Sequence, residues 1–103
     1  MAAAEPEQAS VILRIEHPVI DFDNWKRSFD ADPLGREASG VVGYRVMRAA
    51  DDGKYVLIDL EFGAAEDATA MLGSLEQLWG RVTGTLINDP KGRIVEVVER
   101  ATY

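Results

Sequence analysis

The chain has one histidine, His17, and no cysteine, so its options for acid–base or metal chemistry centre on one imidazole. An imidazole titrates near pH 6.5, at about the point where a general base works best at neutral pH. It could also bind haem iron. The alternative is a purely structural histidine that caps a helix or bonds a backbone carbonyl. One histidine without cysteine argues against zinc, and we expect neither a metal ion nor a resident cofactor.

Large rings and arginines supply the other candidates for a site. Tyr44 could offer a hydroxyl to an oxyanion, and Trp25 and Trp79 could wall a cleft, although tryptophans at helical spacing also form ordinary cores. Arg36 and Arg48 could hold an anionic substrate or could make weak surface pairs. We therefore predict catalytic roles for His17 and Tyr44. We predict ligand-binding roles for Trp25, Arg36, Arg48 and Trp79.

Hydrophobic periodicity predicts the elements that must position these residues. β-Branched residues and alternation predict strands over 11–17, 41–49, 54–62 and 93–98. A short amphipathic helix is expected within 21–32, with Asp21 as its N-cap. A second helix is expected in two pieces, 64–72 and 75–82, because Gly73 interrupts it and Ser74 with Gln77 matches a capping box. Residues 83–87 could form a short extra strand.

The resulting order, β-α-β-β-α-β, predicts an α+β fold of the ferredoxin-like type. In this arrangement a four-stranded antiparallel sheet carries both helices on one face, and the first strand lies between the third and fourth. Residues 11–103 are expected to form this single domain, preceded by a flexible tail over 1–10.

Strand alternation separates a helix-facing side of the sheet from a mixed outer side. We assign Leu57, Ile94 and Val98 to the outer side, with Arg14 and Asp59 among the charged residues there. The remaining outer residues are assigned as Ile12, Glu16, Glu61 and Glu96, and on the strand 41–49 we favour Arg45 and Met47 over the alternative pair Tyr44 and Val46. Such a face could be solvated and laced with ion pairs, or it could pair with a second copy of the chain. We favour the homodimer.

Charge and hydropathy limit the partners and the location. The net charge of −7 opposes binding to nucleic-acid phosphates. No apolar run approaches the roughly 20 residues that span a membrane, and the N-terminus lacks the pattern of a secretory signal. We therefore expect no membrane association and a cytoplasmic location.

The region around the first helix resembles a known superfamily. His17-x-Val19-x-Asp21-Phe22-x-x-Trp25-Lys26 resembles the dimeric α/β-barrel proteins, near the antibiotic-biosynthesis monooxygenase-like group. The resemblance continues through Arg36-Glu37-Ala38-x-Gly40-Val41, Arg48 with Asp51-Asp52, and Phe62 with Glu66 and Ala68, and so covers 11 to about 79. It implies a homodimer whose two sheets close into a barrel, with a ligand cleft between sheet and helices. The stretch after Trp79 departs from the expected pattern.

Two classes of function are compatible with these observations. The first is a small enzyme without a bound cofactor, monooxygenase- or cyclase-like, in which His17 takes a proton from a small hydrophobic substrate and Tyr44 or an arginine steadies the oxyanion. The second is a non-catalytic dimer that binds a small ligand or acts as a stress-associated accessory protein. The residues alone leave both open.

Overall fold

The structure is a computed structural model that describes residues 10–103. The predicted flexible tail therefore lies outside the described residues, except for Ser10, whose carbonyl accepts a hydrogen bond from the Val97 amide at 3.0 Å.

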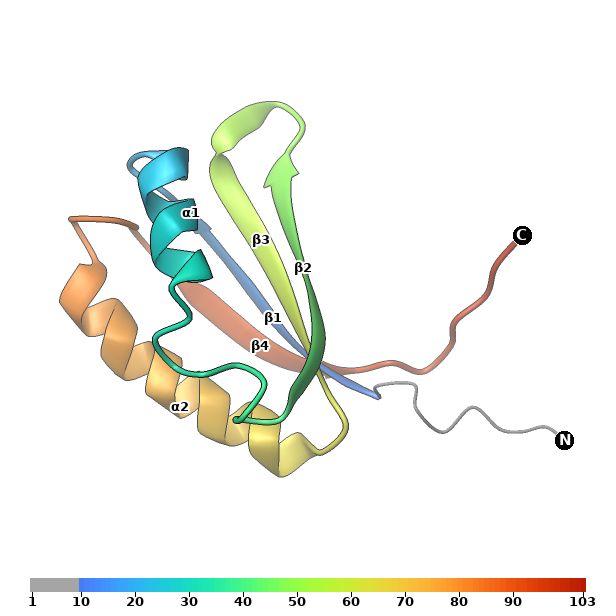
Figure 1. The fold of residues 1–103 in the computed structure, drawn as a ribbon. Coiled ribbons are helices and arrows are strands. Elements are labelled where there is room, and N and C mark those ends of the chain that lie inside the picture. The colour runs from blue at the N-terminus through green and yellow to red at the C-terminus, as the bar shows by residue number, and fades with distance from the viewer. Residues whose placement is uncertain (1–9) are drawn as a thin grey trace, which may run out of the picture.

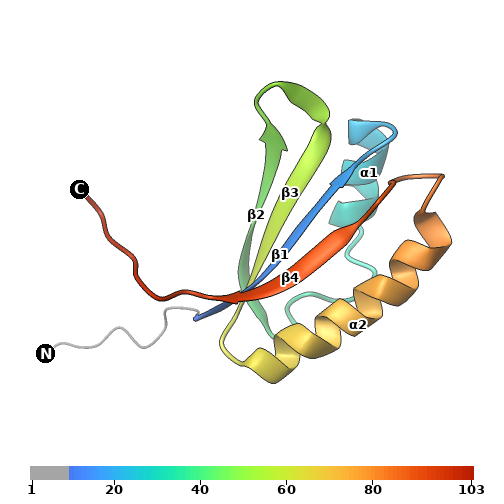
Figure 2. The same ribbon diagram turned by 180° about the vertical axis from the view of Figure 1, so that it is seen from behind.

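Four strands form one antiparallel sheet in the order β2-β3-β1-β4. Their bounds are β1 Val11–Pro18, β2 Val41–Ala49, β3 Asp52–Phe62 and β4 Lys91–Glu96. Both helices cover the same face of the sheet, and the other face carries no helix (Figure 1, and Figure 2 from behind). The ferredoxin-like prediction is confirmed, including the place of β1 between β3 and β4.

Helix α1, Phe22–Asp30, begins as its sequence predicts. The Asp21 carboxylate accepts from the Asn24 amide at 3.0 Å and so satisfies an otherwise unpaired donor of the first turn. Trp25 is the buried residue of the helix. The helix ends before Asp32, whose φ of 55° lies in the left-handed region and turns the chain into the connector.

Helix α2, Ala65–Val82, is continuous, so the prediction of two pieces at an angle is wrong. Met71 and Trp79, on either side of Gly73, are both buried against the same sheet, and this common contact keeps the two halves in line. A glycine inside a helix costs only about 1 kcal/mol relative to alanine, which the burial of two such side chains exceeds. The proposed extra strand at 83–87 is also absent, because these residues form a turn with isolated bridges at Thr83 and Ile87.

Strand pairing corrects two assignments on the sheet faces, those of Ile94 and Glu96. Leu13 pairs with Leu60 on one side and with Ile94 on the other, so Ile94 faces the helices and packs against the core. Glu96 pairs with the core residue Val11 and so shares the helix-facing side. Both outer assignments are wrong because alternation gives only the relative sides of residues in one strand, and the pairing with β1 sets the absolute side. Val95, between them, takes the outer position. Val98 lies beyond the end of β4 and is 90% exposed.

The outer face is otherwise as expected. Arg14 and Arg45 both lie opposite Asp59, which confirms the side assigned to β2. The helix-facing side forms the core, whose largest fully enclosed apolar side chains include Phe62 and Leu13.

Candidate functional site

A cavity of about 120 Å³ lies between the sheet and the two helices. Its floor is the helix-facing side of β1 and β3, and its walls are α1, the connector 31–40 and α2. Most of the lining is apolar, and the polar side chains on it are few. The lining residues are Ile15, His17, Trp25, Ser28, Phe29, Asp32, Pro33, Leu34, Arg36, Ile58, Leu60, Met71, Leu75, Leu78, Trp79, Val82, Leu86 and Ile87.

His17 lies at the end of β1 and is only 2% exposed. Its ring meets Trp25 edge-on, with ring centroids 5.9 Å apart. The Nδ1 atom lies 3.1 Å from the Pro18 carbonyl oxygen. A carbonyl oxygen can only accept, so the proton of the neutral ring sits on Nδ1 and Nε2 keeps a lone pair.

The surroundings of His17 favour its neutral form. Burial disfavours the imidazolium and lowers the pKa of His17 below its usual 6.5, against the smaller opposing effect of the Pro18 carbonyl. In residues 10–103 no hydrogen-bond donor reaches Nε2, and no fully buried polar side-chain atom is left without a partner. Nε2 therefore borders open space, where it can accept a proton or a hydrogen bond.

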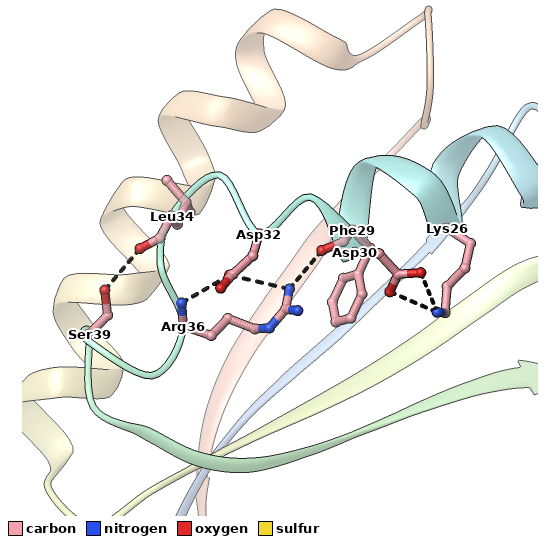
Figure 3. Close-up of polar contacts among 7 residues, drawn as sticks. All are labelled: Lys26, Phe29, Asp30, Asp32, Leu34, Arg36 and Ser39. Carbon is pink, nitrogen blue, oxygen red and sulfur yellow. Dashed lines mark hydrogen bonds and ion pairs between the residues drawn. The ribbon is translucent and has the colours of Figure 1, made fainter.

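Arg36 lies at the rim of the cavity, between the rings of Phe29 and Tyr44, and Figure 3 shows it beside Phe29. Its guanidinium carbon is 4.0 Å from the centroid of Phe29 and 4.8 Å from that of Tyr44, a stacked arrangement that suits a planar cation. Nη1 donates to the Phe29 carbonyl at 2.9 Å and lies 3.6 Å from an Asp32 carboxylate oxygen. Within the described chain, Nε and Nη2 have no acceptor.

The connector holds Arg36 in this place through its own turns (Figure 3). The same Asp32 oxygen accepts from the Arg36 backbone amide at 2.9 Å, and the Ser39 hydroxyl donates to the Leu34 carbonyl at 3.0 Å. Gly40 completes the connector with a φ of 101°, a conformation that side-chain-bearing residues rarely adopt. The arginine is therefore fixed by backbone geometry as well as by stacking.

The fold brings four of the six predicted site residues to one cavity: His17, Trp25, Arg36 and Trp79. Tyr44 lies outside it, 47% exposed, and borders an outer cleft that also contains Arg36. Arg48 lies elsewhere, with its guanidinium 4.4 Å above the Phe22 ring. The roles assigned to all six residues stay predictions.

Several lining residues were not foreseen. Leu86 and Ile87 come from the turn over residues 83–87, for which the sequence suggests a strand, and Asp32 is the last residue of the range predicted for the first helix. The apolar pair at 86–87 between two turns was an available signal, because exposed turns seldom carry two adjacent aliphatic residues.

The opposite face of the sheet carries a compact charge cluster. Asp59 is fully buried and accepts 2.8 Å hydrogen bonds from Nε and Nη2 of Arg14 and from Nη2 of Arg45. The two arginine side chains are 49% and 59% exposed, respectively. Hydrogen bonds from Arg14, opposed by burial, hold the pKa of Asp59 below its ordinary value. Tyr55 also donates to Glu16 at 2.7 Å on this face.

Two features are absent from the part of the chain that the structure describes. No helix there is long and apolar enough to cross a membrane. Nor do three or more carboxylate or imidazole side chains gather closely enough to hold a metal ion.

Comparisons with known proteins identify structural relatives only. No protein-family model and no curated protein sequence matches the chain. A dimeric ferredoxin-like protein from an uncultured marine organism superposes with a TM-score of 0.70 at 8% identity, covering 96% of each chain. The cofactor-independent oxygenase SnoaB from Streptomyces nogalater gives 0.63 at 14% identity, covering 90% of this chain and 97% of its own.

A third solved structure is the heme-degrader MhuD from Mycobacterium tuberculosis, with two hemes bound in its active site. It gives a TM-score of 0.62 at 13% identity and covers 88% of this chain and 99% of its own. At these identities the likeness shows the fold alone. The superfamily resemblance of the sequence is thus confirmed as a resemblance of fold.

Proposed function

We propose that the chain forms a homodimer through the outer face of its sheet, and that the cavity of each protomer is a small-substrate site with His17 as general base. The observation that carries the catalytic part is the state of His17. It is a buried, neutral imidazole with its proton fixed on Nδ1 and its lone pair at an apolar cavity. The chemistry it supports is proton abstraction from a small hydrophobic substrate, without a bound cofactor.

The dimer rests on the composition of the outer face. Leu57 and Ile12, both half-buried, lie among charged side chains on a sheet surface that no helix covers. A second copy placed on this face would remove its apolar area from water. The superposing marine protein is a dimer, which supports a dimer here as well.

General-base chemistry also needs a group that stabilises the negative charge left on the substrate after the proton is removed. Arg36 borders the same cavity and retains free donors at Nε and Nη2. Such donors, fixed in place before the reaction, can hold an anionic group of the substrate or lower the energy of a developing oxyanion. Trp25 and Trp79 complete walls that keep water from the reacting atoms.

The size of the cavity favours a substrate smaller than haem. A space of about 120 Å³ is close to the roughly 150 Å³ that encloses one benzene ring in an engineered protein cavity. A four-pyrrole macrocycle would require the helices to separate from the sheet. The histidine alone therefore does not make this chain a haem protein.

A two-stage experiment tests the proposal. Thermal-shift screening against single-ring phenols and enols, quinones, aromatic polyketides and haem first identifies a stabilising class. Turnover of that class under air is then followed by oxygen uptake and mass spectrometry for the native chain and for His17→Phe, which keeps a ring without a base. We expect turnover in the native chain and its loss in the variant. Stabilisation without turnover of any compound would favour the non-catalytic binding protein.

A further inference from the structure

Two fixed groups at different places on the wall define what the cavity can recognise. His17 offers a hydrogen-bond acceptor at Nε2, and Arg36 offers unused donors on a planar cation. A series of ring contacts separates them: His17 to Trp25 with centroids 5.9 Å apart, then Trp25 to Phe29 at 5.3 Å, then Phe29 to the Arg36 guanidinium at 4.0 Å. A ligand that uses both groups must therefore span the intervening aromatic wall.

The volume suits a ligand whose body is one ring. About 120 Å³ is close to the roughly 150 Å³ that encloses one benzene ring in an engineered protein cavity. The walls between the two polar groups are aromatic and aliphatic, so a flat apolar ring suits them. At one end a hydroxyl can donate to Nε2, and at the other a carboxylate matches the guanidinium fork.

We infer that the cavity binds a monocyclic aromatic acid, with its carboxylate on Arg36 and a ring hydroxyl on Nε2 of His17. This inference rests on the proposed use of the cavity as a ligand site and names the class of ligand. Asp32 is the one competing charge on the lining. Its carboxylate is 37% exposed and is already engaged by the Arg36 backbone amide, which leaves Nε and Nη2 of the arginine to the ligand.

Isothermal titration of the full chain with four probes tests the size and the two polar contacts. The probes are 4-hydroxybenzoate, benzoate, phenol and 6-hydroxy-2-naphthoate, which differ by one hydroxyl, one carboxylate or one ring. We expect 4-hydroxybenzoate to bind best, about fivefold tighter than benzoate for the added hydrogen bond and tenfold or more tighter than phenol for the charged one. The naphthoate should bind more weakly than 4-hydroxybenzoate.

Three variants assign the contacts. His17→Phe should remove the preference for 4-hydroxybenzoate over benzoate while benzoate still binds. Arg36→Gln should weaken both acids about tenfold and leave phenol unchanged, so phenol reports that the cavity is intact. Asp32→Asn keeps an oxygen for the Arg36 amide and removes the competing charge, so it should tighten both acids about two- to fivefold. This last variant gives a readout even if Arg36→Gln fails to fold.

The outcomes separate this inference from the proposed reaction. Acids that bind in the expected order without turnover would support the ligand class and contradict the general-base enzyme. Equal binding of phenol and the two acids, tighter binding of the naphthoate, or no response to Asp32→Asn would overturn the ligand class and leave the role of His17 as a base to be judged by turnover.

Discussion

The buried carboxylate of Asp59 gives the sharpest quantitative test of the outer face. Replacing Arg14 by methionine keeps most of its apolar stem and removes both hydrogen bonds that its guanidinium donates to Asp59. The carboxylate stays fully buried and retains one donor, from Arg45. The variant therefore measures how strongly a buried charge depends on its principal partner.

The expected loss follows from the geometry. A hydrogen bond to a charged group contributes about 1.5–3 kcal/mol when well shielded. The Arg14 side chain is 49% exposed, so water screens its interaction with Asp59. We therefore count only about half of the summed contribution of the two hydrogen bonds. For a protomer whose outer face stays in water, Arg14→Met should lower the free energy of unfolding by about 2 kcal/mol; in the proposed dimer, where a partner sheet covers the pair, the loss should rise to about 3–5 kcal/mol. Arg45→Met removes one bond from a more exposed side chain and should cost about 1 kcal/mol.

Urea unfolding at a fixed protomer concentration measures these differences, because the stability of a dimer depends on concentration. Arg93→Met is the matched control. Arg93 lies directly opposite Arg14 on β4, and it makes no hydrogen bond or ion pair within the described chain. The control should change the unfolding free energy by less than about 0.5 kcal/mol.

The pH dependence provides a second readout. The pKa of Asp59 is lowered in the folded chain, so the ionised carboxylate contributes stability above its ordinary pKa of 3.8, and this contribution is lost as pH falls through the lower folded value. The difference between native chain and Arg14→Met should shrink over that range. If Arg14→Met equals Arg93→Met at neutral pH, the ion pairs are ordinary surface pairs and our account of the face is wrong. A loss of about 3–5 kcal/mol would indicate that a partner sheet fully covers the pair, as the proposed dimer requires, whereas a loss of about 2 kcal/mol would indicate a face that stays in water.

Three further predictions concern the dimer, the histidine and the second helix. Leu57→Asp puts an unpaired charge on the outer face, so light scattering at micromolar concentration should show the monomer mass where the native chain shows twice that mass; a native monomer would contradict the dimer. Burial lowers the pKa of His17, so between pH 6.5 and the lower folded pKa the unfolded chain binds a proton more readily than the folded chain. The free energy of unfolding should therefore fall as pH drops through this range, and thermal denaturation of His17→Phe should lack this slope. Gly73→Ala should raise the unfolding free energy by about 0.5–1 kcal/mol, since nothing lies within 4 Å of the added methyl; a loss would point to a break in α2 at that residue.

Local patterns in the sequence predict the elements and most of their order in space. The N-cap of α1 at Asp21 and the strands β1 to β3 follow from short-range chemistry, and the element order leaves few sheet layouts. The continuity of α2 was missed because the capping-box pattern at Ser74 is local, whereas contacts made by residues on both sides of Gly73 with the sheet decide the outcome. The side of Ile94 was missed for a related reason, since register belongs to a pair of strands.

The sequence by itself determined that the only imidazole is His17 and that it ends a strand on the helix-facing side. It could not determine the tautomer, because that depends on where the Pro18 carbonyl lies relative to Nδ1. Only the tertiary structure places Arg36 at the same cavity and Tyr44 outside it, since the connector reverses direction through backbone torsions at Asp32 and Gly40 that no periodicity encodes. Cavity volume is likewise a property of packing between distant segments, and it is the basis on which we infer a ligand with a single ring.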